Sequence, residues 1–113
     1  MDNCIFCKIV KGEIPSTIVY ESDNVLAFKD INPVSPIHII VVTKAHIESI
    51  AEIDSSNSSV LSEIFEAIAI IAKEQCLSNG YRVVSNVGND AGQTIDHLHF
   101  HLLGGRKLSL SIC

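Results

Sequence analysis

The segment 97–103 reads HLHFHLL, so histidines alternate with apolar residues over its whole length. Side chains on a β-strand point alternately to the two faces of a sheet, and this pattern therefore predicts a strand. His97, His99 and His101 would share one face, spaced about 6.5–7 Å apart, while the apolar residues form a core face on the other. A row of side chains that titrate near neutral pH is typical of a functional site.

Imidazoles arranged in this way can perform nucleophilic and acid–base chemistry. A neutral imidazole is a good nucleophile toward phosphorus, and a protonated neighbour can donate a proton to the departing group. The alternative is a metal site made by all three rings, but side chains this far apart reach one tetrahedral ion at about 2.0–2.1 Å only awkwardly. The pattern therefore favours a division of labour among the three histidines.

The rest of the sequence predicts one α+β domain, residues 1–113, with a mostly antiparallel sheet. Apolar and β-branched runs predict five strands, over residues 17–21, 25–30, 37–43, 81–87 and 97–103. A short N-terminal helix is expected over 4–11 and one long helix over 60–77, ended by Asn79-Gly80. The apolar stripe of the long helix consists of Leu61, Ile64, Phe65, Ile68, Ile71 and Ala72. Ile70 widens that stripe, which indicates that a partner subunit covers the remainder.

Charge and hydropathy argue against two classes of partner. The formal net charge is −5 and the Lys and Arg residues are scattered singly, whereas nucleic-acid-binding proteins usually carry a basic stripe. No basic segment followed by a long apolar run is visible, and the longest apolar stretch, 37–42, is interrupted by His38 and too short to span a bilayer. We therefore expect a cytoplasmic protein that binds neither nucleic acid nor membrane.

Cys4 and Cys7 have the C-x-x-C spacing that lets two thiolates hold one metal ion. A structural disulfide is disfavoured in the cytosol, so the pair is interpreted as a zinc half-site or a redox pair. A thioredoxin-like redox pair would need a βαβ context that this N-terminal segment lacks, and two unconnected cysteines are the remaining alternative. His46 and His97 are natural partners for a zinc site.

The segment 97–103 resembles the signature of the histidine triad (HIT) family, His-φ-His-φ-His-φ-φ, where φ is an apolar residue. Flanking segments are similar to its nucleotide-binding, phosphoramidase-like branch, the Hint or protein kinase C inhibitor-like proteins. These segments are residues 4–15, 25–30, 38–46, 82–86, 92–94 and 103–106, so the resemblance covers nearly the whole chain. It implies a HIT-like fold and hydrolysis of purine nucleoside 5′-phosphoramidates.

The resemblance also implies a role for each site residue. His99 would be the nucleophile that forms a transient nucleotidyl-histidine, and His101 would contact the phosphate and protonate the leaving amine. His38 would border the phosphate, either tuning the other rings or serving as a core residue. Asp30 would hold the ribose hydroxyls, and Ile31 would line the base pocket. Positions around the α-phosphate would be Asn86, Gly92, Gln93 and Thr94, for which ordinary turn chemistry is the alternative.

Zinc-bearing members of the family join a Cys-x-x-Cys pair to two distant histidines, one of them the first of the triad. The residues that match this ligand set are Cys4, Cys7, His46 and His97, which implies a structural zinc site. The family also implies a homodimer built through the long helix and a sheet edge. One departure concerns the tail, because members of this branch often carry a Trp-Pro-Pro-Gly-like segment, whereas this chain has KLSLSIC at 107–113 and no tryptophan.

Two other functions stay open on the sequence. A dinucleoside polyphosphate hydrolase would use the same fold on a different substrate. A nucleotide-sensing module would bind a purine nucleoside monophosphate without meaningful turnover. The first is distinguished by the relative rates on the two substrate classes, and the second by intact ligand binding without a measurable rate.

Overall fold

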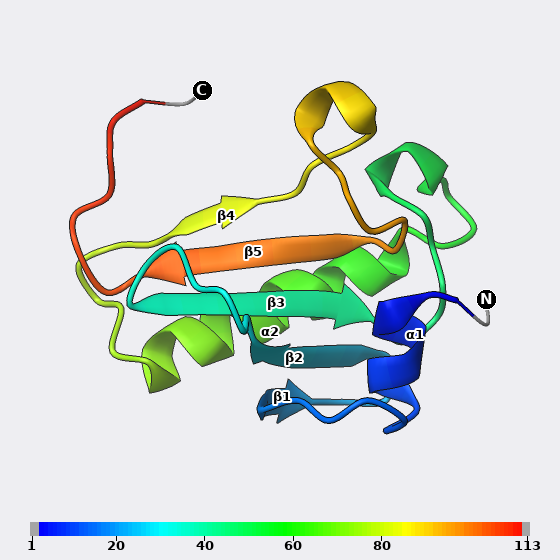
Figure 1. Cartoon of the computed structure of the whole chain (residues 1–113), viewed down its shortest axis with the longest axis horizontal. Helices are drawn as coiled ribbons and strands as arrows, with labels where there is room; N and C mark the ends of the chain where they lie inside the picture. Colours follow the sequence, from blue (N-terminus) through cyan, green and yellow to red (C-terminus); the bar gives the residue numbers. More distant parts are fainter. Residues whose placement is uncertain (1–2, 112–113) are drawn as a thin grey trace.

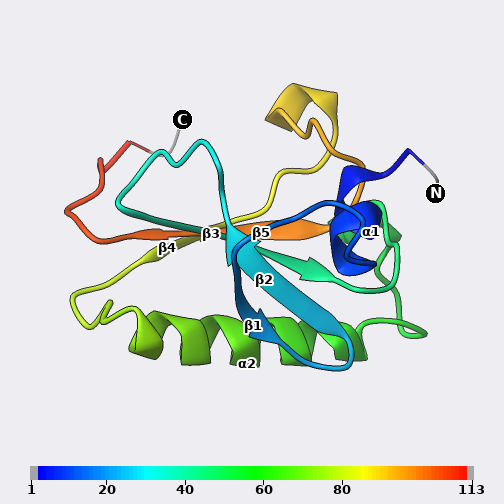
Figure 2. The ribbon, with the colours of Figure 1, turned by 60° about the horizontal axis from the view of Figure 1, so that its bottom comes forward.

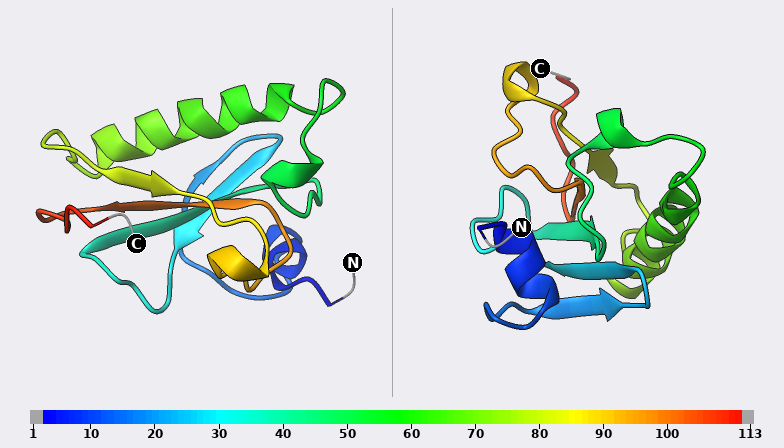
Figure 3. Two further views of the ribbon diagram at one scale, coloured as in Figure 1. Left: turned by 90° about the horizontal axis from the view of Figure 1, so that it is seen from above. Right: turned by 90° about the vertical axis from the view of Figure 1, so that its right-hand side faces the viewer.

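The computed structural model describes residues 3–111, which form a five-stranded antiparallel sheet with helices on both faces (Figures 1 and 3). The strands are β1 (Ile18–Glu21), β2 (Val25–Lys29), β3 (Ile37–Thr43), β4 (Arg82–Val84) and β5 (His99–Gly104), in the spatial order β1-β2-β3-β5-β4. The helices are α1 (Ile5–Val10) and α2 (Ser59–Glu74), with short 3₁₀ turns at Ile50–Glu52 and Asn89–Ala91. The α+β prediction with one long and one short helix is confirmed.

The long helix α2 covers one face of the sheet and buries the larger apolar cluster (Figure 2). Ile64 and Ile71 of α2 are fully buried there. Leu98, Phe100 and Leu102 belong to the same cluster, so the apolar half of the alternating segment faces the core as predicted. Each such side chain contributes roughly 1.5–3 kcal/mol when it is removed from water.

The short helix α1 packs on the opposite face, where Phe6 and Ile9 join a second apolar cluster with residues of β2 and β3. The same face of β3 and β5 carries histidines, because His101 pairs with Ile40 and His99 pairs with Val42 across the two strands. This face therefore combines a small core under α1 with a row of imidazoles.

Three predicted boundaries of the elements were wrong. The helix α2 ends at Glu74 because Cys76 adopts a left-handed conformation (φ +60°) and the Leu77 amide donates to the Ala72 carbonyl. The strand predicted over 81–87 is limited to β4, since its pairing with β5 ends at Val84. The strand β5 begins at His99 rather than at residue 97.

The predicted core stripe of α2 was also too wide. Phe65 is 53% exposed, although its ring contacts Phe100 at a centroid separation of 5.7 Å. Ile70 is exposed as well, in agreement with its predicted place outside the part of the stripe that the sheet covers. One sheet face cannot cover an apolar stripe of this width, so these side chains stay at the surface of the chain.

Within the described part of the chain, no helix is long and apolar enough to cross a membrane.

Candidate functional site

Titratable side chains that the sequence places far apart meet in two clusters. Cys4, Cys7, His46 and His97 form the cysteine–histidine cluster, and Asp30, His38 and His101 form the aspartate–histidine cluster. Within each cluster the atoms that could bind a metal lie within 4.8 Å of one another. The structure thus brings together the predicted zinc ligands and three of the predicted catalytic or substrate-binding residues.

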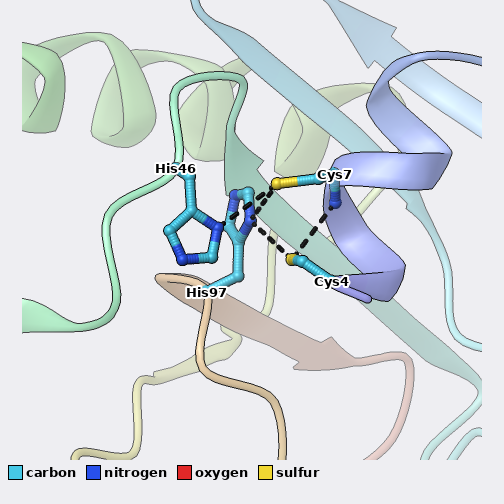
Figure 4. A group of neighbouring side chains, drawn as sticks. All are labelled: Cys4, Cys7, His46 and His97. Carbon is cyan, nitrogen blue, oxygen red and sulfur yellow. Dashed lines mark hydrogen bonds between the residues drawn. The ribbon is translucent and has the colours of Figure 1, made fainter. Parts of the chain in front are cut away.

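The cysteine–histidine cluster joins the start of α1 to the loop after β3 and the segment that leads into β5 (Figure 4). Cys4 Sγ lies 3.3 Å from His97 Nδ1, and Cys7 Sγ lies 3.2 Å from His46 Nδ1 and 3.6 Å from His97 Nδ1. The Cys7 amide donates to Cys4 Sγ at 3.3 Å. All four side chains converge on one point, as Figure 4 shows.

These separations fit a tetrahedral zinc ion. Zinc–sulfur and zinc–nitrogen bonds of about 2.3 and 2.0–2.1 Å place neighbouring ligand atoms about 3.5 Å apart. His97 Nε2–H donates to the Thr43 carbonyl at 2.7 Å, which leaves the Nδ1 lone pair free for an ion. Burial lowers the pKa of His97, so the ring is neutral as a ligand must be. Burial and the adjacent Cys4 raise the pKa of Cys7, and a cation would offset this by favouring the thiolate.

The aspartate–histidine cluster lies toward the other end of β3. His38 Nε2 is 2.9 Å from His101 Nδ1 and 3.3 Å from Asp30 Oδ2. On its other side the His38 ring accepts a hydrogen bond at Nδ1 from the Val34 amide, at 3.1 Å. Asp30 is held by the Asn32 amide, which donates to Oδ1. A cavity of about 110 Å³ is lined by Asp30 and His38 among others.

Burial keeps the rings of this cluster neutral. Desolvation lowers the pKa of His38, and the Asp30 carboxylate acts in the opposite direction. Desolvation also lowers the pKa of His101, with further lowering from His99 and His38 and partial compensation by Asp30. Both rings are therefore uncharged near pH 7 until a negative charge arrives beside them.

His99 connects the two clusters. Its Nδ1–H donates to the His97 carbonyl at 2.7 Å, so the lone pair of the neutral ring is on Nε2. The His99 ring lies 5.1 Å from that of His101 and 5.0 Å from that of Phe6, edge to face in both pairs. The Ser85 hydroxyl donates to the His99 carbonyl at 2.7 Å. The arrangement presents one imidazole nitrogen as a nucleophile, next to a second imidazole.

The predicted phosphate loop lies between β4 and β5, and its residues take several positions. The Gln93 side chain braces this loop, because it accepts from the Gly88 amide and donates to the Glu48 and Ile95 carbonyls. Thr94 lines a different cavity, of about 470 Å³, beside Cys4 and His46. Gly92 has the left-handed backbone (φ +79°) that favours glycine, and Asn86 is half-buried. Ile31, next to Asp30, is 90% exposed.

Sequence reasoning missed four groups that hold the histidines in place. They are the Ser85 hydroxyl, the Thr43 carbonyl, the His97 carbonyl and the Val34 amide. Three of the four are backbone atoms, which no residue type can signal. Ser85 was assigned to a strand, where a serine attracts no notice.

Comparisons with known proteins agree with this geometry. A protein-family model described as "Scavenger mRNA decapping enzyme C-term binding" matches residues 3–111. A solved HIT family hydrolase from Clostridium thermocellum is 46% identical, with a TM-score of 0.98 over 100% of this chain and 99% of that one. A histidine triad protein from Clostridium difficile is 52% identical, with a TM-score of 0.94 over 98% and 96% of the two chains.

Two further matches carry functional descriptions. A "14 kDa zinc-binding protein" from Zea mays is 43% identical over 93% of this chain and 84% of its own. A histidine triad nucleotide-binding protein from Candida albicans is 33% identical, with a TM-score of 0.82 over 96% of this chain and 85% of that one. The similarity extends over nearly the whole chain in each case.

Proposed function

This chain belongs to the histidine triad (HIT) family, and from that premise we propose that it hydrolyses purine nucleoside 5′-phosphoramidates through a nucleotidyl intermediate on His99. Relatives described as a hydrolase and as a nucleotide-binding protein support the general class of activity. The choice of the P–N bond and the covalent intermediate are our proposals.

The observation that carries the proposal is the orientation of His99. Its Nδ1–H donates a hydrogen bond to the His97 carbonyl, so the only lone pair of the neutral ring is on Nε2. An imidazole held in this tautomer by a backbone carbonyl is ready to attack without rearrangement. Asp30 lies beside His38 and His101, with its carboxylate within 4.8 Å of their ring nitrogens, and it can accept hydrogen bonds from ribose hydroxyls.

The proposed reaction has two displacements at phosphorus. His99 Nε2 forms a bond to phosphorus while the P–N bond of the substrate breaks, and the nitrogen leaves as a neutral amine with a proton from His101. The bound phosphate favours the protonated form of His101, because an adjacent negative charge raises the pKa of an imidazole. Water then attacks phosphorus, His101 takes the proton, and the bond to His99 breaks to release the nucleoside monophosphate.

Single-turnover trapping tests this reaction. Protein is mixed with adenosine 5′-phosphoramidate, quenched in base and digested, and the adenylylated peptide is located by mass spectrometry. We expect the label on His99, because a phosphorus–nitrogen bond to imidazole survives base and is lost in acid. A label on another residue, or none during measurable turnover, contradicts the proposal. A parallel assay with a diadenosine polyphosphate assigns the substrate class, and much faster turnover of that compound would overturn the phosphoramidate.

We also propose that the cysteine–histidine cluster binds a structural zinc ion, which the fit of its four donors and the zinc-binding maize relative support. The ion would tie the N-terminal segment to the segment that leads into β5. Metal analysis of protein purified without chelator tests this, with one zinc per chain expected.

The apolar residues that α2 and β4 leave exposed support a homodimer. Phe65, Ile70 and Val83 are between 39% and 53% exposed, and Tyr81 just before β4 is 44% exposed. A second copy of the chain is the proposed partner. Light scattering at micromolar concentration tests it, and a mass of 12.3 kDa would contradict a dimer.

A further inference from the structure

The His38 ring is held on both sides by atoms whose roles can be assigned. A backbone amide can only donate, so the bond from the Val34 amide requires a lone pair on His38 Nδ1. The single proton of the neutral ring is then on Nε2. That atom faces His101 Nδ1 at 2.9 Å and Asp30 Oδ2 at 3.3 Å.

We propose that the Val34 amide is a positioning group that sets the direction of the hydrogen bonds across this cluster. With its Nδ1 occupied, His38 donates from Nε2 and His101 accepts at Nδ1. Neutral His101 consequently carries its own proton on Nε2, the nitrogen that does not face His38. The inference deepens the proposed function, because it assigns the tautomer of the ring that serves the leaving group.

The hydrogen bond from the Val34 amide to His38 Nδ1 gives Asp30 a second role, as an acceptor for the His38 proton. His101 becomes an acid when a proton from solvent enters at Nδ1, where it meets the Nε2–H of His38, which then donates to Asp30 Oδ2 instead. The leaving amine takes the His101 Nε2 proton, and Nε2 takes the proton of the attacking water while Nδ1 stays protonated. The Asp30 carboxylate thus stabilises the protonated pair, while the amide prevents His38 from taking the charge at Nδ1.

The hydrogen bond from the Val34 amide also makes the aspartate–histidine cluster a poor metal site, although it contains two imidazoles and a carboxylate. A metal-bound histidine normally donates its other ring N–H to a carbonyl, a carboxylate or water. Binding an ion at His38 Nε2 would move the ring proton to Nδ1, against the Val34 N–H. The cluster should therefore leave a divalent ion to the cysteine–histidine cluster.

Nitrogen-15 NMR of the zinc-loaded protein at pH 7.5 tests the inference without any turnover. Two-bond and three-bond couplings identify which nitrogen of each ring is protonated. We expect His38 and His101 both to be Nε2–H tautomers in the parent chain. A proton on Nδ1 of either ring in the parent overturns the inference.

A matched pair of variants isolates the amide. Val34→Pro removes the N–H, whereas Val34→Ala keeps it and removes most of the side chain. We expect Val34→Ala to retain both tautomers and Val34→Pro to give a mixture at His38, with a second equivalent of Co²⁺ bound more tightly. Unchanged tautomers in a folded Val34→Pro protein overturn the inference. Should Val34→Pro not fold, the parent measurement decides alone. Label found away from His99 in the trapping experiment would refute the reaction but leave these tautomers untouched.

Discussion

The cysteine–histidine cluster and the aspartate–histidine cluster contain similar numbers of potential ligands at similar separations, yet they suit different chemistry. In the first cluster, His97 Nε2–H donates a hydrogen bond to the Thr43 carbonyl, which leaves a lone pair on Nδ1 for a metal. In the second cluster, His38 Nδ1 accepts a hydrogen bond from the Val34 amide, which leaves the ring proton on Nε2 for a neighbour. The backbone group that bonds one nitrogen of each ring therefore decides whether the other nitrogen carries a lone pair or a proton.

The largest expected effect is a loss of turnover in a His99 variant that still binds zinc. His99→Ala should lower turnover of adenosine 5′-phosphoramidate by at least about 10³-fold, since it removes the nucleophile. Bound zinc should remain at one ion per chain, because the His97 ring keeps its own contacts with Cys4 and Thr43. Steady-state kinetics and metal analysis check the two statements. Loss of zinc in this variant would show that the nucleophile and the metal site are not separable.

The next effect concerns the metal cluster itself. Cys7→Ser should abolish stoichiometric zinc binding and reduce the free energy of unfolding by about 3 kcal/mol, because the site links α1 to β5. The melting temperature should fall by about 10 °C or more. The matched change in the other cluster, His38→Gln, should leave the zinc content at one per chain. Two zinc ions per parent chain, or zinc lost in both variants, would contradict the distinction between the clusters.

A smaller effect is expected for one hydroxyl beside His99 and one beside the cysteine–histidine cluster. Ser85 donates to the His99 carbonyl and Thr43 donates to the Ala45 carbonyl. Ser85→Ala and Thr43→Val should each reduce the free energy of unfolding by about 1 kcal/mol. Ser85→Ala should lower turnover several-fold with zinc affinity unchanged. Thr43→Val should weaken zinc binding several-fold and leave the turnover of the zinc-loaded enzyme unchanged. Equal effects of both variants on rate would mean that the two regions are not independent.

Much of this arrangement could be predicted from the sequence, for physical reasons. The alternation of histidines and apolar residues over 97–103 predicted a strand whose apolar face packs in the core. Leu98, Phe100 and Leu102 are buried there. The C-x-x-C spacing predicted a metal half-site that now has two histidines beside it. Local patterns of this kind need no knowledge of the rest of the chain.

Other features depend on contacts that no local pattern contains. Cys76 ends α2 in a left-handed conformation that is rare for a residue other than glycine, so the helix was predicted too long. His97 precedes β5 because the pairing of that strand with β3 begins at Val42 and His99, and its ring contacts the thiols and Thr43. The tautomers of the rings follow from the Val34 amide and the His97 carbonyl, which are common to every residue type.

The last expected effect is a pH dependence of the free energy of unfolding, to which the aspartate–histidine cluster should contribute. Burial, His99 and His38 lower the pKa of His101, and Asp30 only partly opposes them. An unfolded chain takes up a proton at this histidine below about pH 6.5, whereas the folded chain does not, so stability should fall as the pH drops from 7.5 to 5.5. His101→Asn should flatten this dependence, by at most about 1.4 kcal/mol per pH unit. Denaturant unfolding of the parent and the variant at matched zinc occupancy measures the difference. A variant that loses stability as steeply as its parent would mean that folding does not lower the pKa of His101. The position of the ring protons in this cluster would then be set by the direction of its hydrogen bonds alone.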